Sequence, residues 1–292
     1  MSIDVLIEKI KEKKNPTVAG LDPKLDYVPD FIKKEFPDTL KGAAEAIFEF
    51  NKQLIDKLSD VVAAVKPQSA YYEMYGYHGV ETLHKTIEYA HSKGLYVITD
   101  GKRNDIGSTA EAYSAAYFGA DTFNSDALTV NGYLGTDGIK PFLRADKSIF
   151  VLVKTSNPSS GELQDMVLQN GKTVYEQMAD MVNEWGADFI GKHGYSNVGA
   201  VVGATYPEQL KKLRAAMPKA YLLVPGYGAQ GGTADAAANA FNPDGLGAVI
   251  NASRSIMCAY KKTGSEQDFA AAARDEAIRM RDELTSAIRS KA

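Results

Sequence analysis

The segment Asp100-Gly-Lys-Arg-Asn-Asp105 combines two carboxylates with an ammonium group directly after an apolar run. In an extended backbone, Asp100 and Lys102 point to the same side, and Gly101 lets the chain pass close to a ligand. Charged side chains in this arrangement can stabilise charge that develops on a substrate and can transfer a proton. The segment is therefore a candidate catalytic site. The simpler interpretation is a local ion pair, with Asp105 only capping the next helix.

A second candidate site lies towards the end of the chain and suits an anion. Four of the seven residues 226–232 are glycine, and their backbone N–H groups can approach a phosphate closely. A later apolar run ends in an arginine, which offers a permanently charged, planar fork for phosphate. Together the two segments predict a phosphate site, against the alternatives of a flexible turn and a surface salt bridge. Its candidate residues are Pro225, Gly226, Gln230, Gly231, Ser253 and Arg254.

Other polar side chains also stand where apolar runs end. Asp22 follows the first run, Lys66 follows the second, and Ser156 lies just after the fifth. A charged residue directly after an apolar strand is unexpected if the segment only fills a core. In a barrel of parallel strands, functional groups lie at the carboxyl ends of the strands. We therefore expect Asp22 and Lys66 to meet Asp100 at one end of the fold.

Short apolar runs alternate with longer amphipathic stretches along the whole chain. Eight runs are predicted to be strands, at residues 17–21, 61–65, 95–99, 127–130, 149–153, 198–202, 221–224 and 247–250. They are nearly free of charge, as parallel strands buried on both faces should be. No Pro-, Gly- or Ser-rich linker divides them, which favours an α/β fold with one (β/α)8 TIM-barrel domain over residues 1–292. An open doubly wound sheet is the alternative, because periodicity does not show closure.

Helices and insertions complete this pattern. One apolar stripe typical of a helix consists of Ile47, Phe50, Leu54 and Leu58. Residues 108–111 predict a capping box, and the amphipathic segment 3–14 is expected to close the bottom of the barrel. Long polar segments are predicted to be loop insertions at residues 23–39, 131–147 and 157–171.

Two aromatic groups have less specific interpretations. The tyrosines in the segment 71–77 lack basic neighbours, so we expect core or dimer packing rather than stacking on bases. Their positions are Tyr71, Tyr72, Tyr75 and Tyr77. His193 lies near a predicted strand, which leaves a minor role on the substrate side open.

Composition excludes several classes of protein. The chain carries 33 Lys and Arg residues against 37 Asp and Glu, a net charge of −4, so no nucleic-acid partner is expected. Apolar residues at 45% and charged residues at 24% are typical of globular proteins. The apolar runs are too short to cross a bilayer, and the N-terminus lacks the core of a signal peptide. Cys258 is the single cysteine, which excludes an intrachain disulfide. We expect a cytoplasmic protein without a membrane partner.

The order and spacing of these motifs closely resemble orotidine 5′-phosphate decarboxylase. The resemblance rests on Lys66, on Asp100-x-Lys102-x-x-Asp105-Ile106-x-x-Thr109 and on Pro225-Gly-Tyr-Gly-Ala-Gln230-Gly. The longer bacterial subgroup is the nearest match, because Lys66-Pro-Gln and Thr155-Ser-Asn-Pro are also similar. The resemblance extends over residues 17–256. It implies a cofactor-free TIM barrel and homodimer that converts orotidine 5′-phosphate to uridine 5′-phosphate (UMP) and CO2, the last step of UMP biosynthesis.

The resemblance also implies a role for each matching position. Lys66, Asp100, Lys102 and Asp105 match the family's alternating charged network, with Asp105 and Thr109 entering the active site of the neighbouring subunit. Asp22 matches the ribose ligand and Ser156 the pyrimidine contact, while Gln230 and Arg254 match the phosphate ligands. The other substrate-binding positions are Ile106, Pro225, Gly226, Gly231 and Ser253. Ser253 departs from shorter members of the family, which have glycine before the arginine.

The implied chemistry needs no metal or cofactor. Loss of CO2 from C6 of the pyrimidine leaves an electron pair that the ring cannot delocalise well. Lys102 would stabilise this charge and supply the proton, and Asp100 would repel the substrate carboxylate. Lys66 and Asp105 would keep these two charges paired and in register.

Two rival functions come from different classes. Metal-dependent decarboxylases and aldolases of ketose phosphates resemble this chain in their barrel and motif, but they carry an acidic metal ligand where this chain has Lys66. An ammonium group there would repel Mg2+, so no metal site is expected. A non-catalytic protein that binds phosphate ligands is the second rival. Binding alone does not require Asp100 beside an anionic substrate.

Overall fold

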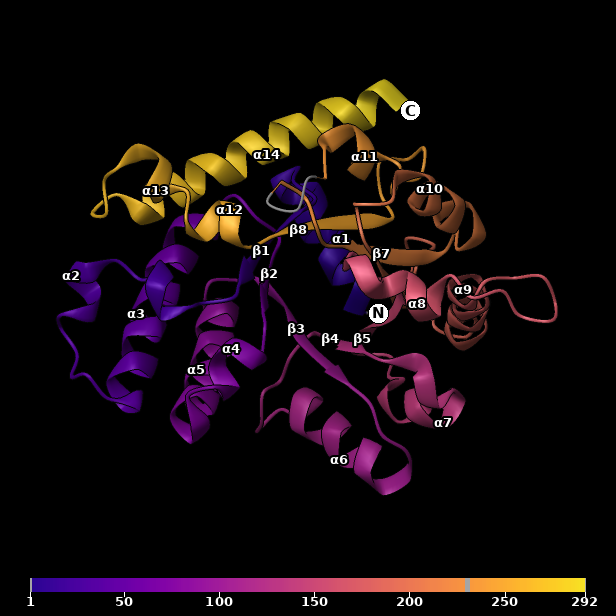
Figure 1. The fold of residues 1–292 in the computed structure, drawn as a ribbon, viewed down its shortest axis with the longest axis horizontal. Coiled ribbons are helices and arrows are strands. Elements are labelled where there is room, and N and C mark those ends of the chain that lie inside the picture. The colour runs from indigo at the N-terminus through magenta and orange to yellow at the C-terminus, as the bar shows by residue number, and fades with distance from the viewer. Residues whose placement is uncertain (1, 229–231, 292) are drawn as a thin grey trace.

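The computed structural model describes residues 2–228 and 232–291, in which eight parallel strands close into a barrel in chain order (Figure 1). The strands are β1 (Thr17–Leu21), β2 (Ala64–Pro67), β3 (Tyr96–Arg103), β4 (Ala127–Val130), β5 (Ser148–Lys154), β6 (Ser196–Val202), β7 (Ala220–Val224) and β8 (Ala248–Ala252). β1 pairs with both β2 and β8, which completes the ring. The predicted (β/α)8 barrel is therefore confirmed, and the open sheet is wrong.

Helices surround the strands and also fill the insertions. The longer helices are α1 (Ser2–Lys13), α3 (Leu40–Leu58), α5 (Gly76–Ser92), α6 (Gly107–Phe118), α9 (Val174–Gly186), α10 (Pro207–Ala216) and α14 (Phe269–Lys291). Short helices are α2 (Asp30–Lys33), α4 (Ala70–Glu73), α7 (Thr136–Ile139), α8 (Gly161–Gln164), α11 (Ala234–Ala238), α12 (Arg254–Met257) and α13 (Tyr260–Thr263). Single 3-10 turns are η1 (Leu25–Tyr27), η2 (Gly132–Leu134), η3 (Lys140–Phe142) and η4 (Pro158–Ser160). The three predicted insertions thus contain short helical turns.

Two strands differ from their predicted bounds in ways that affect the site. β2 begins at Ala64 because Val61 lies in the turn after α3, where its N–H donates to the carbonyl of Leu58. Lys66 therefore lies within a strand rather than after it. β3 continues beyond its apolar run to Arg103. The polar end of this strand is part of the barrel wall.

The main apolar core lies between the barrel and its helices. The predicted stripe of α3 is confirmed, since its four side chains are almost completely buried: Ile47, Phe50, Leu54 and Leu58. Phe50 also stacks on Phe269 of α14, with ring centroids 5.1 Å apart. Figure 1 shows α14 running along one side of the barrel. This packing holds the first and last parts of the chain together.

A second core fills the barrel and is closed by α1. Leu6 and Ile7 are fully buried in one cluster with Tyr96 and Tyr221 from the strands. Burial of this apolar face stabilises the helix against the barrel. Figure 1 shows α1 at the centre of the ring, so the prediction that the N-terminal segment closes the bottom is confirmed.

One open interpretation is excluded and one local prediction is wrong. His193 lies beside α1 at the bottom of the barrel, where its backbone N–H donates to Asp4 at 3.1 Å, so the role left open for it on the substrate side is excluded. The capping box at residues 108–111 does not form, because α6 begins at Gly107, whose φ is +52°, and is preceded by Ile106 without a side-chain cap. Among the described helices, none is long and apolar enough to span a membrane.

Candidate active site

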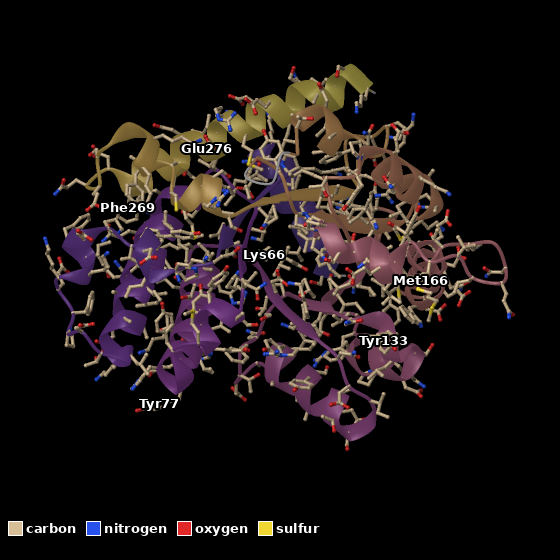
Figure 2. All side chains as sticks on the ribbon, viewed as in Figure 1. Lys66, Tyr77, Tyr133, Met166, Phe269 and Glu276 are labelled. Carbon is tan, nitrogen blue, oxygen red and sulfur yellow. The ribbon has the colours of Figure 1, made fainter. Side chains whose placement is uncertain are left out.

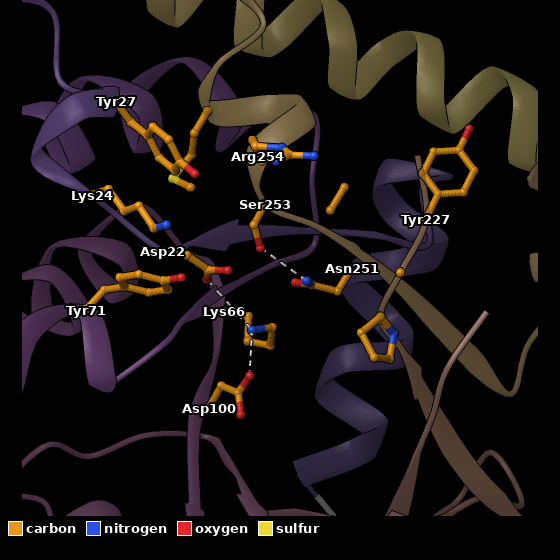
Figure 3. Close-up of a pocket in the computed structure, with 14 residues that line it drawn as sticks. Asp22, Lys24, Tyr27, Lys66, Tyr71, Asp100, Tyr227, Asn251, Ser253 and Arg254 are labelled. Atoms are coloured by element: carbon orange, nitrogen blue, oxygen red, sulfur yellow. Dashed lines mark hydrogen bonds and ion pairs between the residues drawn. The ribbon is translucent and has the colours of Figure 1, made fainter. Parts of the chain in front are cut away.

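Two adjoining cavities open at the carboxyl ends of the strands. One has a volume of about 370 Å³ and extends from Lys66 towards Arg254 (Figure 3). The other has a volume of about 430 Å³ and extends from Lys66 towards Ser156. Both are lined by Lys66, Asp100 and Pro225, so these residues stand where the two cavities meet. The fold thus brings the predicted charged residues to one mouth.

A chain of alternating charges lies at this junction. The Nζ of Lys66 donates to Oδ2 of Asp100 at 2.9 Å and lies 3.9 Å from Oδ1 of Asp22. The Nζ of Lys102 donates to the other oxygen of Asp100, Oδ1, at 2.6 Å. The Lys66 side chain is only 4% exposed, whereas that of Lys102 is 46% exposed. Lys66 is therefore an internal partner, and Lys102 is the ammonium that a ligand can reach.

Both buried members of this chain keep their charge at neutral pH. Burial tends to raise the pKa of Asp100, but the ammonium groups of Lys66 and Lys102 hold that pKa well below its usual range. Burial tends to lower the pKa of Lys66, but the carboxylates of Asp100 and Asp22 raise it. Opposite charges at short distance thus outweigh desolvation in both groups.

An irregular stretch of β3 aims these side chains into the cavity. The register between β3 and β4 shifts between Thr99 and Arg103. Within it, Lys102 has a φ of +45°, which is uncommon for a residue with a side chain. Such bulges redirect side chains and often lie beside active sites. The predicted approach of Asp100 and Lys102 is confirmed, although the backbone between them is not a regular strand.

The ends of β7 and β8 build the end of the site for which an anion was predicted. Ser253 and Arg254 line the first cavity together with Pro225 and Gly226. Gly226 has a φ of +98°, and a Cβ on Gly20 would lie 1.9 Å from Oγ of Ser253. Glycine at position 20 is thus required for the turn that carries the arginine. Gln230 and Gly231, also predicted for this end, lie outside the described residues.

The β5 insertion forms the wall of the second cavity. Ser156 lines it, beside Thr155 and Gln164. Gln164 of α8 accepts from the N–H of Thr155 at 2.9 Å and donates to its Oγ1 at 2.8 Å. The buried Lys154 donates to the neighbouring Asp165 at 2.7 Å. The insertion is thereby held against the end of the strand that presents Ser156.

Three of the predicted residues that the structure describes do not line either cavity. Oδ1 of Asp105 accepts from the N–H of Ile106 at 2.8 Å, at the start of α6. Ile106 is 52% exposed, and Thr109 is exposed one turn further along the helix. This chain alone therefore does not bring Asp105, Ile106 and Thr109 to the charged group.

Several cavity residues were not predicted from the sequence. Figure 3 shows Lys24 pointing into the first cavity between Tyr27 and Tyr71. Tyr71 thus lines a cavity, which the packing predicted for the tyrosine segment did not include, whereas Tyr72 is buried as expected. Asn251 and Thr129 also line the cavities. The only available signal was their position near the ends of predicted strands.

The donor set suits an anionic ligand better than a cation. Among the described residues, no three His, Cys, Asp or Glu side chains gather closely enough to hold a metal ion. The two carboxylates at the junction, Asp22 and Asp100, instead face the ammonium of Lys66. Together with Arg254 and Lys102, this arrangement can hold a phosphate at one end and stabilise a developing negative charge at the other.

Comparisons with known proteins agree with this geometry. A protein-family model described as "Orotidine 5'-phosphate decarboxylase / HUMPS family" matches residues 33–267. The chain is 46% identical over 274 residues to the orotidine 5′-phosphate decarboxylase of Caldicellulosiruptor saccharolyticus, which covers 88% of this chain and 90% of that protein. It is 42% identical to the Clostridium perfringens enzyme of the same name, over 99% of both chains. The solved structure of Leishmania donovani OMP decarboxylase superposes with a TM-score of 0.79 at 32% identity, over 99% of both chains. This chain belongs to the orotidine 5′-phosphate decarboxylase / HUMPS family.

Proposed function

We propose that this protein converts orotidine 5′-phosphate to UMP and CO2, the last step of UMP biosynthesis. The observation that carries this proposal is the Lys66–Asp100–Lys102 group. In it, the two ammonium groups donate to the two oxygens of the buried Asp100 carboxylate. Relatives that are 46% and 42% identical, aligned over most of this chain, bear the name of this enzyme. The charged group suits the carboxylated pyrimidine of such a substrate, and the arginine of the first cavity suits its phosphate.

Lys102 is proposed as the residue that supplies the proton. As the C6–CO2 bond breaks, the bonding electron pair stays on C6, and the nearby ammonium group stabilises it before donating a proton to that carbon. The Asp100 carboxylate repels the substrate carboxylate, and this repulsion disappears when neutral CO2 forms. Lys66 keeps Asp100 ionised and in place, since one unpaired charge at this depth would be costly.

The remaining cavity residues are proposed to bind the rest of the nucleotide. Arg254 and Ser253 suit the phosphate, with Pro225 and Gly226 shaping the turn beside them. Family resemblance adds Gln230 and Gly231 to this group. Asp22 is proposed as a ribose ligand and Ser156 as the contact to the pyrimidine. Phosphate contacts far from C6 contribute binding energy that can also accelerate the reaction.

We also propose a homodimer in which Asp105, Ile106 and Thr109 enter the site of the neighbouring subunit. Support comes from the exposure of Ile106 and Thr109, and from Tyr133 of a nearby insertion (Figure 2), which is 75% exposed. The insertion that carries Tyr133 lies beside Asp105, because a Cβ on Gly138 would lie 3.3 Å from the Asp105 carbonyl. The chain is proposed to act as one domain in the cytoplasm.

The decisive experiment measures CO2 release from orotidine 5′-phosphate in the presence and absence of EDTA. We expect rapid release that EDTA does not change, because Lys66 occupies the base of the cavity where a divalent cation would need a carboxylate. Activity lost with EDTA and restored by Mg2+ would favour the metal-dependent relatives. Nucleotide binding without any turnover would favour a non-catalytic binding protein.

A further inference from the structure

The bulge in β3 disrupts the ladder of hydrogen bonds between β3 and β4, and a single residue of β4 compensates for this. From Thr99 to Arg103 the chain of β3 advances four positions, while β4 advances only two, from Leu128 to Val130. The residue that stands opposite this excess is Thr129. A bulge removes backbone groups from the regular ladder, and these groups need other hydrogen-bond partners.

The Thr129 side chain provides that partner. Its Oγ1 accepts from the N–H of Lys102 at 2.9 Å and donates to Oδ1 of Asp100 at 2.8 Å. A hydroxyl has one hydrogen to donate, and the ionised Asp100 can only accept, so the direction of both bonds is fixed. Thr129 is 1% exposed, which keeps water from replacing either bond.

The contacts close into a ring around the reactive groups. The Nζ of Lys102 returns to the same Oδ1 of Asp100, at 2.6 Å. Lys102 also holds a left-handed backbone conformation, with φ of +45°, which persists only where its surroundings determine it. The hydroxyl of Thr129 therefore restrains both the backbone of Lys102 and the carboxylate of Asp100.

We propose that Thr129 is a positioning residue for the decarboxylation, acting through Lys102 and Asp100. This inference rests on the proposed function and deepens it. The hydroxyl donates its only hydrogen to Asp100, so it has none left to donate to the substrate, and its proposed role is positioning rather than binding. Loss of the hydroxyl should consequently affect kcat and leave KM nearly unchanged.

The test compares Thr129→Val, which removes the hydroxyl at constant shape, with Thr129→Ser, which retains it. We expect T129V to lower kcat for orotidine 5′-phosphate by roughly 10- to 100-fold, the loss typical of a hydrogen bond to a charged group. KM should stay within about threefold, and T129S should recover most of the activity. Thr99→Val is the matched control, since Thr99 is a buried strand threonine whose hydroxyl pairs with Ser125 at 2.6 Å. T99V should keep nearly full kcat.

Several outcomes would overturn the positioning role. These are T129V with nearly full kcat, T129S as impaired as T129V, an equal loss in T99V, or a loss confined to KM. If T129V does not fold, Thr129→Cys repeats the comparison with a much weaker donor. A crystal structure of T129V provides a readout without turnover, in which we expect Lys102 or the Asp100 carboxylate to move. If wild type releases no CO2, the proposed function fails, and an unchanged Lys102 and Asp100 in that crystal structure would reject the role of Thr129 separately.

Discussion

Lys66 and Asp100 form an ion pair of 2.9 Å that is almost closed to solvent at the centre of the barrel mouth. Lys66 has a second carboxylate within reach, because Asp22 lies 3.9 Å away. Two carboxylates therefore share one buried ammonium group, while Asp100 also accepts a hydrogen bond from Lys102. The pair couples the charge of the site to the stability of the fold.

This coupling predicts a specific dependence of stability on pH. The pKa of Asp100 is lower in the folded protein than in the unfolded chain, so its contribution is present above about pH 4 and disappears as the pH falls. We expect Asp100→Asn to lower the free energy of unfolding by about 3 kcal/mol at pH 7, because it leaves Lys66 with only Asp22. Urea denaturation should show the difference shrinking below about pH 4. Asp121→Asn, at an exposed position, is the control. A difference that stays constant down to pH 2 would contradict the assigned cause.

Replacement of Lys102 should separate chemistry from binding. We expect Lys102→Ala to reduce kcat by at least about 100-fold, because proton transfer and charge stabilisation are both lost. Asp100 keeps its bond to Lys66, so the fold and the affinity for UMP should be largely unchanged. Stopped assays with purified protein and a UMP titration measure the two effects. A variant that keeps substantial turnover would remove Lys102 from the acid role and make Lys66 the next candidate.

Arg254 should matter only for ligands that carry a phosphate. We expect Arg254→Ala to lower kcat/KM for orotidine 5′-phosphate by roughly 10- to 100-fold, which corresponds to a charge-assisted hydrogen bond. Free orotidine, which lacks the phosphate, should be nearly insensitive to the change. Parallel rate measurements with both substrates provide the comparison. Equal losses would assign Arg254 a structural role instead.

The shared site of the proposed dimer can be tested by mixing two inactive variants. Lys102→Ala and Asp105→Ala should each be nearly inactive alone. After subunit exchange, each heterodimer has one site with both changes and one site with neither. Random exchange makes about half of the dimers mixed, so about a quarter of wild-type activity should return. A tag on one variant verifies exchange, and exchange without recovered activity would place Asp105 in the site of its own subunit.

The sequence predicted those site residues whose position follows from topology alone. Asp22, Lys66 and Arg254 lie near the ends of apolar runs, and a parallel barrel brings all such ends to one mouth. The bounds of β2 were less predictable. Val61 is as apolar as a strand residue, but it is buried in the turn after α3. An apolar, buried residue can belong either to a turn that precedes a strand or to the strand itself, so the apolar pattern does not fix where β2 begins.

The features that were missed depend on local backbone geometry. Thr129 lies in an apolar run, and its contact with Asp100 exists only because β3 bulges opposite it. The alternation of apolar runs and amphipathic stretches along the sequence does not indicate where two paired strands shift in register. Lys24 lies in the loop between β1 and η1, and Tyr71 lies in the short helix α4 that follows β2. Side-chain directions in such short segments depend on dihedral angles that residue types do not fix.

The packing of α1 has a consequence for how molecules leave the protein. Leu6 and Ile7 fill the amino end of the barrel without measurable exposure, so the described residues leave the axis closed on that side. Under the proposed function, CO2 forms at the junction of the two cavities, between the buried side chains of α1 and the bound nucleotide. CO2 and the nucleotide then both leave at the carboxyl ends of the strands, where the two cavities open. A movement that uncovers this end of the barrel therefore serves the release of both products.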